Sequence, residues 1–191
     1  MVDSSPTCPE LSLGDRFRVR SLRGSEYVVT FLQRGPSEAG TYVRLDDRRI
    51  ARLSDDRVDW STCAMVSAPG EPPLGIGDEL LVETPSGTLR GRLAEQVSTE
   101  LVLRSSAGPV LRIPRSTAVR VWLLFPATEL RAGDGFLVRS RTGNEYQGEV
   151  LATYPDRLQV RLMGGREFTL RLERLDLDSV FVPILLPLQA L

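Results

Sequence analysis

The side chains whose types and spacing best suit ligand binding are arginines at alternating positions. Arg16, Arg18 and Arg20 occur at every second position, so they share one face of a β-strand, where they could neutralise phosphate groups. Arg139 and Arg141 repeat this alternation further along the chain. With tyrosines that could stack on nucleobases, they define a predicted binding surface of Arg16, Arg18, Arg20, Arg139, Arg141, Arg161, Tyr27, Tyr146 and Tyr154.

The same arginines have a second interpretation, a solvated sheet face on which they pair with acids. The chain has 24 basic residues, all arginine, and 25 acidic ones, for a net charge of -1. No overall field therefore attracts it to nucleic acid or to an anionic membrane. Glu83 also stands where the neighbouring segments carry Arg20 and Arg139. A continuous basic track would favour nucleic acid, whereas arginines interleaved with acids would favour a solvated face or contact with protein.

Missing residue types exclude most kinds of catalysis. Without histidine or lysine, the chain cannot form a Ser–His–Asp triad, a Cys–His pair, a lysine Schiff base or a lysine-bearing phosphate loop. Cys8 and Cys63 form no CxxC motif and make a poor zinc ligand set, and two thiols fit a reducing compartment. Adjacent acids such as Asp46 and Asp47 are typical of solvated turns. We therefore expect no enzymatic activity, no catalytic residue, no cofactor and no metal.

The arginines lie on a unit that occurs three times. It reads GDRFRVRSLRG at Gly14–Gly24, GDELLVETPSG at Gly77–Gly87 and GDGFLVRSRTG at Gly133–Gly143, with the two glycines ten positions apart each time. The second glycine is expected in a turn, because glycine adopts positive φ without steric cost. The aspartate after the first glycine is expected to close a turn rather than to bind a ligand.

Each repeat is predicted to contain five short antiparallel strands, with a one-turn helix before the last one. Examples are the strands expected at 48–53, 145–153 and 179–183. No segment shows a helical apolar period, so the chain is predicted to be all-β. The predicted divisions are a flexible tail at 1–10, repeat one at 11–66, a linker at 67–73, repeat two at 74–125, repeat three at 126–183 and an apolar tail at 184–191. Because one such unit buries a marginal core, we expect the three to pack together.

The repeat resembles small, strongly bent barrels of the SH3-like type, including KOW and Tudor domains, and of the Sm-like type. The residues that resemble the first Sm motif are Gly143, Tyr146, Gly148 and Val150, followed by Leu158. The Sm family binds RNA through an Asn after the second strand and an Arg-Gly turn near the last strand. Here residues 154–157 read YPDR, and no Arg-Gly turn precedes the last strand. The resemblance therefore implies three tandem five-stranded barrels without the RNA site.

Barrels of this kind host many unrelated functions. We predict a non-catalytic binding or scaffolding protein whose barrel surfaces contact a protein partner. The alternative is binding of RNA or single-stranded DNA through the Arg-bearing first strands. Arg48 and Arg52 also match the RxxxR spacing of cyclic-di-GMP-binding PilZ domains, but the motif that follows it in that family is missing.

No signal peptide or membrane span is visible, so we expect a cytoplasmic location and no membrane partner. The apolar run Phe181–Leu191 is expected to seal an interface, within the chain or in a dimer.

Overall fold

The computed structural model describes residues 10–35, 40–67, 72–106, 108–127 and 130–188. These residues form fifteen strands and two single-turn 3-10 helices, which confirms the prediction of an all-β chain. The chain divides into two compact units, unit 1 at Met1–Pro73 and unit 2 at Leu74–Leu191. The predicted tail at 1–10, apart from Glu10, lies outside the described residues, as do positions 68–71 of the predicted linker.

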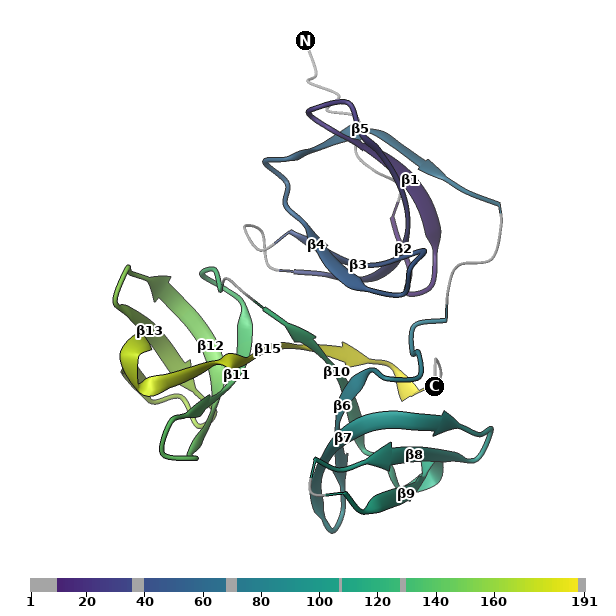
Figure 1. Ribbon diagram of the computed structural model, residues 1–191. Coiled ribbons are helices and arrows are strands. Elements are labelled where there is room, and N and C mark those ends of the chain that lie inside the picture. Colours follow the sequence, from purple (N-terminus) through teal and green to yellow (C-terminus); the bar gives the residue numbers. More distant parts are fainter. Residues whose placement is uncertain (1–9, 36–39, 68–71, 107, 128–129, 189–191) are drawn as a thin grey trace. The chain divides into compact units, whose positions relative to one another are not determined.

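Unit 1 contains repeat one as a five-stranded antiparallel sheet. Its strands are β1 (Arg16–Ser21), β2 (Glu26–Arg34), β3 (Thr41–Leu45), β4 (Ile50–Leu53) and β5 (Val58–Met65). They lie in the order β4-β3-β2-β1-β5 (Figure 1). Phe17 and Val19 on β1 are fully buried, whereas Arg18 between them and Arg20 after them are exposed, as the alternation predicts. Val29 and Val43 complete the centre of this core.

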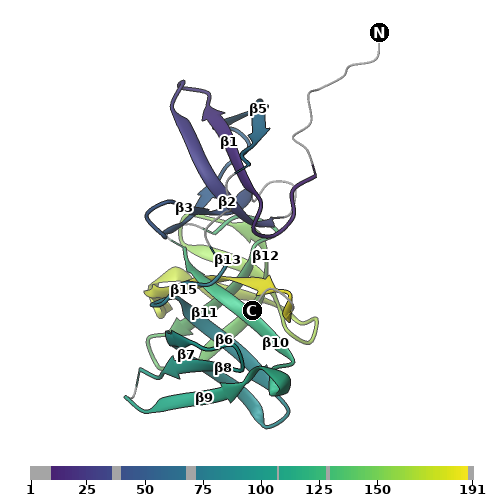
Figure 2. The ribbon, with the colours of Figure 1, turned by 90° about the vertical axis from the view of Figure 1, so that its right-hand side faces the viewer.

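Unit 2 contains repeats two and three in one ten-stranded sheet. Its elements are β6 (Glu79–Thr84), β7 (Gly87–Gln96), β8 (Glu100–Arg104), β9 (Val110–Pro114), η1 (Arg115–Thr117), β10 (Arg120–Pro126), β11 (Gly135–Ser140), β12 (Glu145–Thr153), β13 (Arg157–Leu162), β14 (Glu167–Arg171), η2 (Leu172–Arg174) and β15 (Leu175–Leu186). The order is β14-β13-β12-β11-β15-β10-β6-β7-β8-β9. Each half thus repeats the order of unit 1, and Figure 2 shows β7, β8 and β9 following one another to the edge of the sheet.

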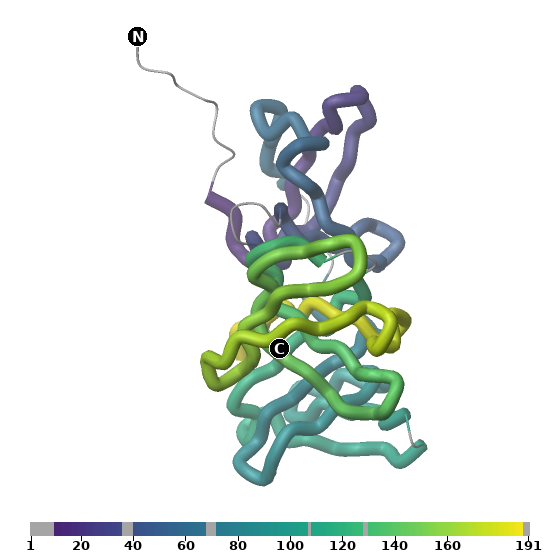
Figure 3. The backbone as a smooth tube through the Cα atoms, turned by 90° about the vertical axis from the view of Figure 1, so that its left-hand side faces the viewer, coloured from purple at the N-terminus to yellow at the C-terminus, as the bar shows by residue number. Residues whose placement is uncertain are grey.

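The pairing of β10 with β15 joins the two repeats. Residues 121–126 of β10 pair antiparallel with residues 181–186 of β15, and Figure 3 shows the yellow β15 running through the middle of unit 2. The described residues therefore form two open sheets of five and ten strands, whereas the sequence predicted three barrels. The predicted strand at 179–183 is too short, and the predicted division after 183 falls inside β15. The apolar run does form an interface within the chain, over residues 181–186.

The Gly-Asp pair makes the same turn in all three repeats. The aspartate carboxylate accepts the backbone N–H of the residue three positions earlier, at 2.7 Å each time, in Asp15, Asp78 and Asp134. The glycine N–H donates across to the second strand, for example from Gly14 to the carbonyl of Phe31 at 3.0 Å. The aspartates therefore fix the start of each first strand, in agreement with their interpretation as turn residues.

Each repeat also bends at one place in its second strand. The pairing of the second strand with the third shifts register after Phe31, after Leu93 and after Val150, which are corresponding positions. Such bulges bend a strand and increase its twist. The bend brings the fourth strand of repeat three toward the turn between β11 and β12, where both line one pocket.

Two findings concern features that the sequence left open. Cys63 is disulfide-bonded, contrary to the expectation of reduced thiols, and the chain's other cysteine, Cys8, lies outside the described residues. A disulfide needs two close Cα atoms, which sequence separation does not reveal. Among the described residues, no helix is long and apolar enough to cross a membrane.

Candidate binding site

The predicted arginines of repeat one are paired with acids. Arg16 lies 2.9 Å from Asp46, and Arg18 and Arg20 lie 3.9 and 3.4 Å from the two carboxylate oxygens of Glu26. Tyr27 follows Glu26 on β2 and is 38% exposed. This face therefore interleaves opposite charges, which is the pattern expected of a solvated face or a protein contact.

In repeat three the structure separates the predicted residues into different surroundings. Arg161 is paired with Glu149 and Glu167, at 3.4 Å in each case. Tyr154 lies under the guanidinium of Arg157, 4.6 Å from the ring centroid, and lines an apolar pocket of about 440 Å³. Arg139 borders a groove between repeats two and three, whereas Arg141 and Tyr146 line a pocket at one end of repeat three.

The groove between repeats two and three has a volume of about 680 Å³. We call it the inter-repeat groove. The charged residues that line it are Glu79, Arg90, Arg92, Arg104, Arg139 and Glu145. They come from β6, β7, β8, β11 and β12, so the groove exists only because β10 and β15 hold the two repeats together.

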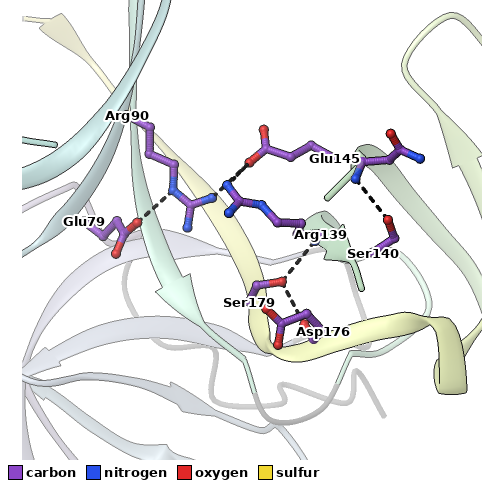
Figure 4. Close-up of polar contacts among 8 residues, drawn as sticks. Glu79, Arg90, Arg139, Ser140, Glu145, Asp176 and Ser179 are labelled. Carbon is purple, nitrogen blue, oxygen red and sulfur yellow. Dashed lines mark hydrogen bonds and ion pairs between the residues drawn. The ribbon is translucent and has the colours of Figure 1, made fainter. Parts of the chain in front are cut away.

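Arg90 is the central side chain of this groove (Figure 4). Its Nε donates a hydrogen bond to Glu79 at 2.7 Å, and its Nη1 lies 3.5 Å from Glu145 of the other repeat. Its guanidinium also lies 4.7 Å from the ring centroid of Phe181. Arg139 in turn donates to Glu145 at 2.9 Å. Because planar guanidinium groups hold carboxylates in fixed geometry, this row of charges makes one wall of the groove rigid.

Sequence reasoning missed Arg90, Glu79 and Glu145. Arg90 and Glu145 are 55 residues apart and come from different repeats, so only the β10–β15 pairing brings them together. The alternation of Arg90 with Arg92 is the one local signal, and it resembles that of Arg16, Arg18 and Arg20.

The pocket at the end of repeat three has a volume of about 490 Å³. We call it the end pocket. It combines the predicted Arg141 and Tyr146 with Arg171 and with two residues that sequence reasoning did not select, Phe168 and Arg174. These come from the β11–β12 turn, β12, β14 and η2, which the bend of the repeat brings together. An anion with an apolar neighbour is the chemistry that such a lining recognises.

Cysteine and acidic side chains are the described residues that could bind a metal ion. No group of three or more cysteine, aspartate or glutamate side chains that could hold a metal ion occurs among them. Asp47 is adjacent to Asp46, and hydrogen bonds from Arg49 lower the pKa of its exposed carboxyl group. That carboxylate therefore stabilises the turn in which it lies.

Comparison with known proteins gives no relative from which to transfer a role. No protein-family model matches the chain, and no curated protein matches it either.

Proposed function

We propose that the chain is a non-catalytic scaffold that binds a protein partner. The observation that carries this proposal is the pairing of five of the six predicted arginines with acids. Arg16, Arg18, Arg20, Arg139 and Arg161 each lie within 4.0 Å of a carboxylate oxygen. Nucleic-acid affinity depends on unpaired cations that neutralise phosphates, whereas protein interfaces tolerate balanced polar rims.

The modules of this scaffold are, in our proposal, bent five-stranded units of the SH3-like type. Two observations support this view. The strand order is the same in all three repeats, and a 3-10 turn precedes the last strand in repeats two and three. Such modules present their loops and open ends to ligands while the sheet stays rigid.

We further propose the inter-repeat groove as the main contact surface. The Glu79–Arg90–Glu145–Arg139 row fixes one wall before any partner arrives, which reduces the entropy lost on binding. Arg92, which lies 3.8 Å from Glu79, is 75% exposed at the rim, and Arg104 is exposed beside it. A partner can therefore reach both arginines from solvent.

The experiment compares protein and nucleic-acid binding by the full chain. The immobilised chain is incubated with nuclease-treated extract of its own organism and cross-linked, and labelled single-stranded RNA and DNA are titrated in parallel at low salt. We expect a nuclease-resistant protein partner, lost in the Arg92→Glu/Arg104→Glu variant and kept in an Arg23→Glu/Arg166→Glu control of equal charge change. Oligonucleotide binding that falls with salt and is lost in the first variant would overturn the proposal in favour of nucleic acid.

A further inference from the structure

The end pocket gathers more positive charge than the surfaces around it. Three arginines line it, Arg141, Arg171 and Arg174, together with one glutamate, Glu173. All three arginine side chains are exposed to solvent. The hollow therefore presents an excess of cations to a ligand, unlike the outer faces of β1 and β13, on which arginines pair with acids of the neighbouring strands.

Two of these arginines are available for a ligand. Arg171 is loosely paired with Glu173 at 3.7 Å. Arg141 and Arg174 make no ion pair with any acid of the described residues. Arg141 is oriented by a hydrogen bond of 3.4 Å from its Nε to the carbonyl oxygen of Leu175, which leaves its two terminal nitrogens for other acceptors. A carboxylate that enters the pocket would meet these nitrogens directly.

Two aromatic residues form the apolar part of the pocket. Tyr146 pairs with Val138 across β11 and β12, and Phe168 pairs with Val160 across β13 and β14. Directly paired residues lie on the same face of a sheet, and both valines are buried in the core. Phe168 is nevertheless 42% exposed. The two rings therefore lie at the open mouth of the core, where an apolar side chain of a ligand could cover them.

The other two repeats show that the fold does not require this lining. The strand registers and the matched hydrogen bonds from Leu22 to Arg57 and from Arg141 to Arg174 identify the corresponding positions. In repeat one the positions that correspond to the pocket residues are occupied by Leu22, Tyr27, Ala51, Ser54 and Arg57. In repeat two they hold Pro85, Leu89, Leu111, Pro114 and Thr117. Three arginines and two aromatics occur together only in repeat three, so the shared strand order does not depend on them.

The neighbouring strand offers main-chain groups to a ligand. Residues 168–171 of β14 line the pocket, and β14 is the last strand of its sheet. The outer edge of β14 pairs with no strand among the described residues, and an extended peptide can bind such an edge as an added strand. The side chains of that peptide would then alternate between the pocket and solvent.

We propose that the end pocket binds an extended acidic segment of the protein partner. The peptide backbone lies along β14, its carboxylates bind Arg141 and Arg174, and an apolar side chain packs on Tyr146 and Phe168. This inference rests on the proposed function and names the chemistry of the partner. A peptide suits the pocket better than a nucleic acid, because the outer edge of β14 offers backbone groups that an extended peptide chain can pair with.

The test uses the full chain and a labelled decapeptide of glutamates with a central phenylalanine. The matched probe has glutamine in place of every glutamate. By fluorescence anisotropy we expect the acidic peptide to bind about tenfold more tightly than the glutamine peptide, with a difference that shrinks at high salt. The Arg141→Gln/Arg174→Gln variant should lose about tenfold in affinity for the acidic peptide, whereas an Arg23→Gln/Arg57→Gln control should be unchanged.

Further variants keep the test decisive. Arg174→Lys retains the charge and should retain most of the affinity, which separates loss of charge from loss of fold. Equal binding of the two peptides, or an unchanged affinity in the Arg141→Gln/Arg174→Gln variant, would overturn the inference. Binding of a labelled uridine decanucleotide that this variant abolishes would assign the pocket to nucleic acid instead. A captured partner that needs Arg92 and Arg104 but not Arg141 and Arg174 would refute the pocket and leave the proposed function intact.

Discussion

The last strands of units 1 and 2 differ, although the repeats share one strand order. In unit 1, β5 ends at Met65, the residue that pairs with Phe17 of the first strand. In repeat two the corresponding pair is Leu123 with Leu80, but β10 continues to Pro126. In repeat three β15 likewise continues to Leu186. These extensions of β10 and β15 pair with each other, whereas β5 is the edge strand of its sheet.

The residues that follow the corresponding last pairs explain why β10 and β15 are extended and β5 is not. Repeat two continues as Leu-Phe-Pro after Leu123, and repeat three as Pro-Ile-Leu-Leu after its counterpart Val182. Repeat one continues as VSAPGEPP, which has few large apolar side chains that a second sheet could bury. Whether one repeat forms its own sheet or half of a larger sheet therefore depends on the few residues that follow the last pair between its final strand and its own first strand.

The largest expected effect on stability comes from weakening the β10–β15 junction, which has no counterpart in unit 1. Phe181 is 8% exposed in a cluster with Leu81, Leu124 and Leu137, and Arg90 lies over its ring. Phe181→Ala should lower the free energy of unfolding of unit 2 by about 3–5 kcal/mol, measured by urea denaturation. Phe168→Ala, at a half-exposed ring of the same unit, should cost far less. Equal losses in the two variants would show that the β10–β15 junction contributes little to stability.

The second effect concerns the bent second strands. A Cβ atom on Gly148 would clash with the backbone oxygen of Arg161, whereas the corresponding Val29 of repeat one is tolerated in its core. Gly148→Ala should therefore destabilise unit 2 by about 1–3 kcal/mol in the same denaturation experiment. Gly135→Ala is the control, since its nearest contact would be an ordinary 3.6 Å to Pro183. A neutral Gly148→Ala would mean that β12 and β13 approach each other less closely than we describe.

The sequence predicted the strands well wherever local pattern decides them. The predicted strand at 145–153 matches β12 in full, because alternation and flanking turns mark both of its ends. The predicted strand at 48–53 begins two residues later, at Ile50, because Arg48 has a φ of 68° and belongs to the turn. β15 was predicted too short because its second half is fixed by pairing with β10, a long-range contact with no local signal.

The candidate site was predicted less well, for a related reason. Alternation placed Arg139 and Arg141 on one strand face, but β11 ends at Ser140, so Arg141 lies in the turn and enters the end pocket. Only the bend of the repeat brings Phe168 and Arg174 into the same pocket as Arg141. Spacing along the chain identifies residues that share an element, whereas a pocket collects residues from elements that folding brings together.

A smaller effect should come from the bulge in the last strand, which repeats one and three have and repeat two lacks. In repeat three Ser179 Oγ accepts the N–H of Arg139 at 3.0 Å and donates to the Asp176 carbonyl at 2.7 Å. Thr62 does the same for Arg20. Ser179→Ala should cost about 0.5–1.5 kcal/mol by denaturation, and Ser179→Thr should be nearly neutral because it keeps the hydroxyl group. Similar losses in both variants would show that the hydroxyl does not hold the bulge.

The smallest expected effect has the opposite sign and concerns the turn between the third and fourth strands. Arg48, Gly108 and Gly165 occupy the corresponding position in the three repeats, all with positive φ. In each, the backbone N–H of this residue donates to the carbonyl three positions earlier. A side chain is strained in this conformation by about 1–2 kcal/mol, which glycine avoids.

Relative to Arg48→Ala, Arg48→Gly should therefore stabilise unit 1, by at most about 1 kcal/mol, because the greater freedom of glycine in the unfolded chain offsets part of the gain. The Arg48 carbonyl, which accepts a 2.7 Å hydrogen bond from Arg44, is kept in the variant. Arg48→Ala is the control, since alanine removes the guanidinium but keeps the strain. If Arg48→Gly is the less stable of the two by thermal denaturation, the Arg48 side chain is not the source of the strain. The left-handed turn would then be no more costly in repeat one than in its two glycine-bearing copies.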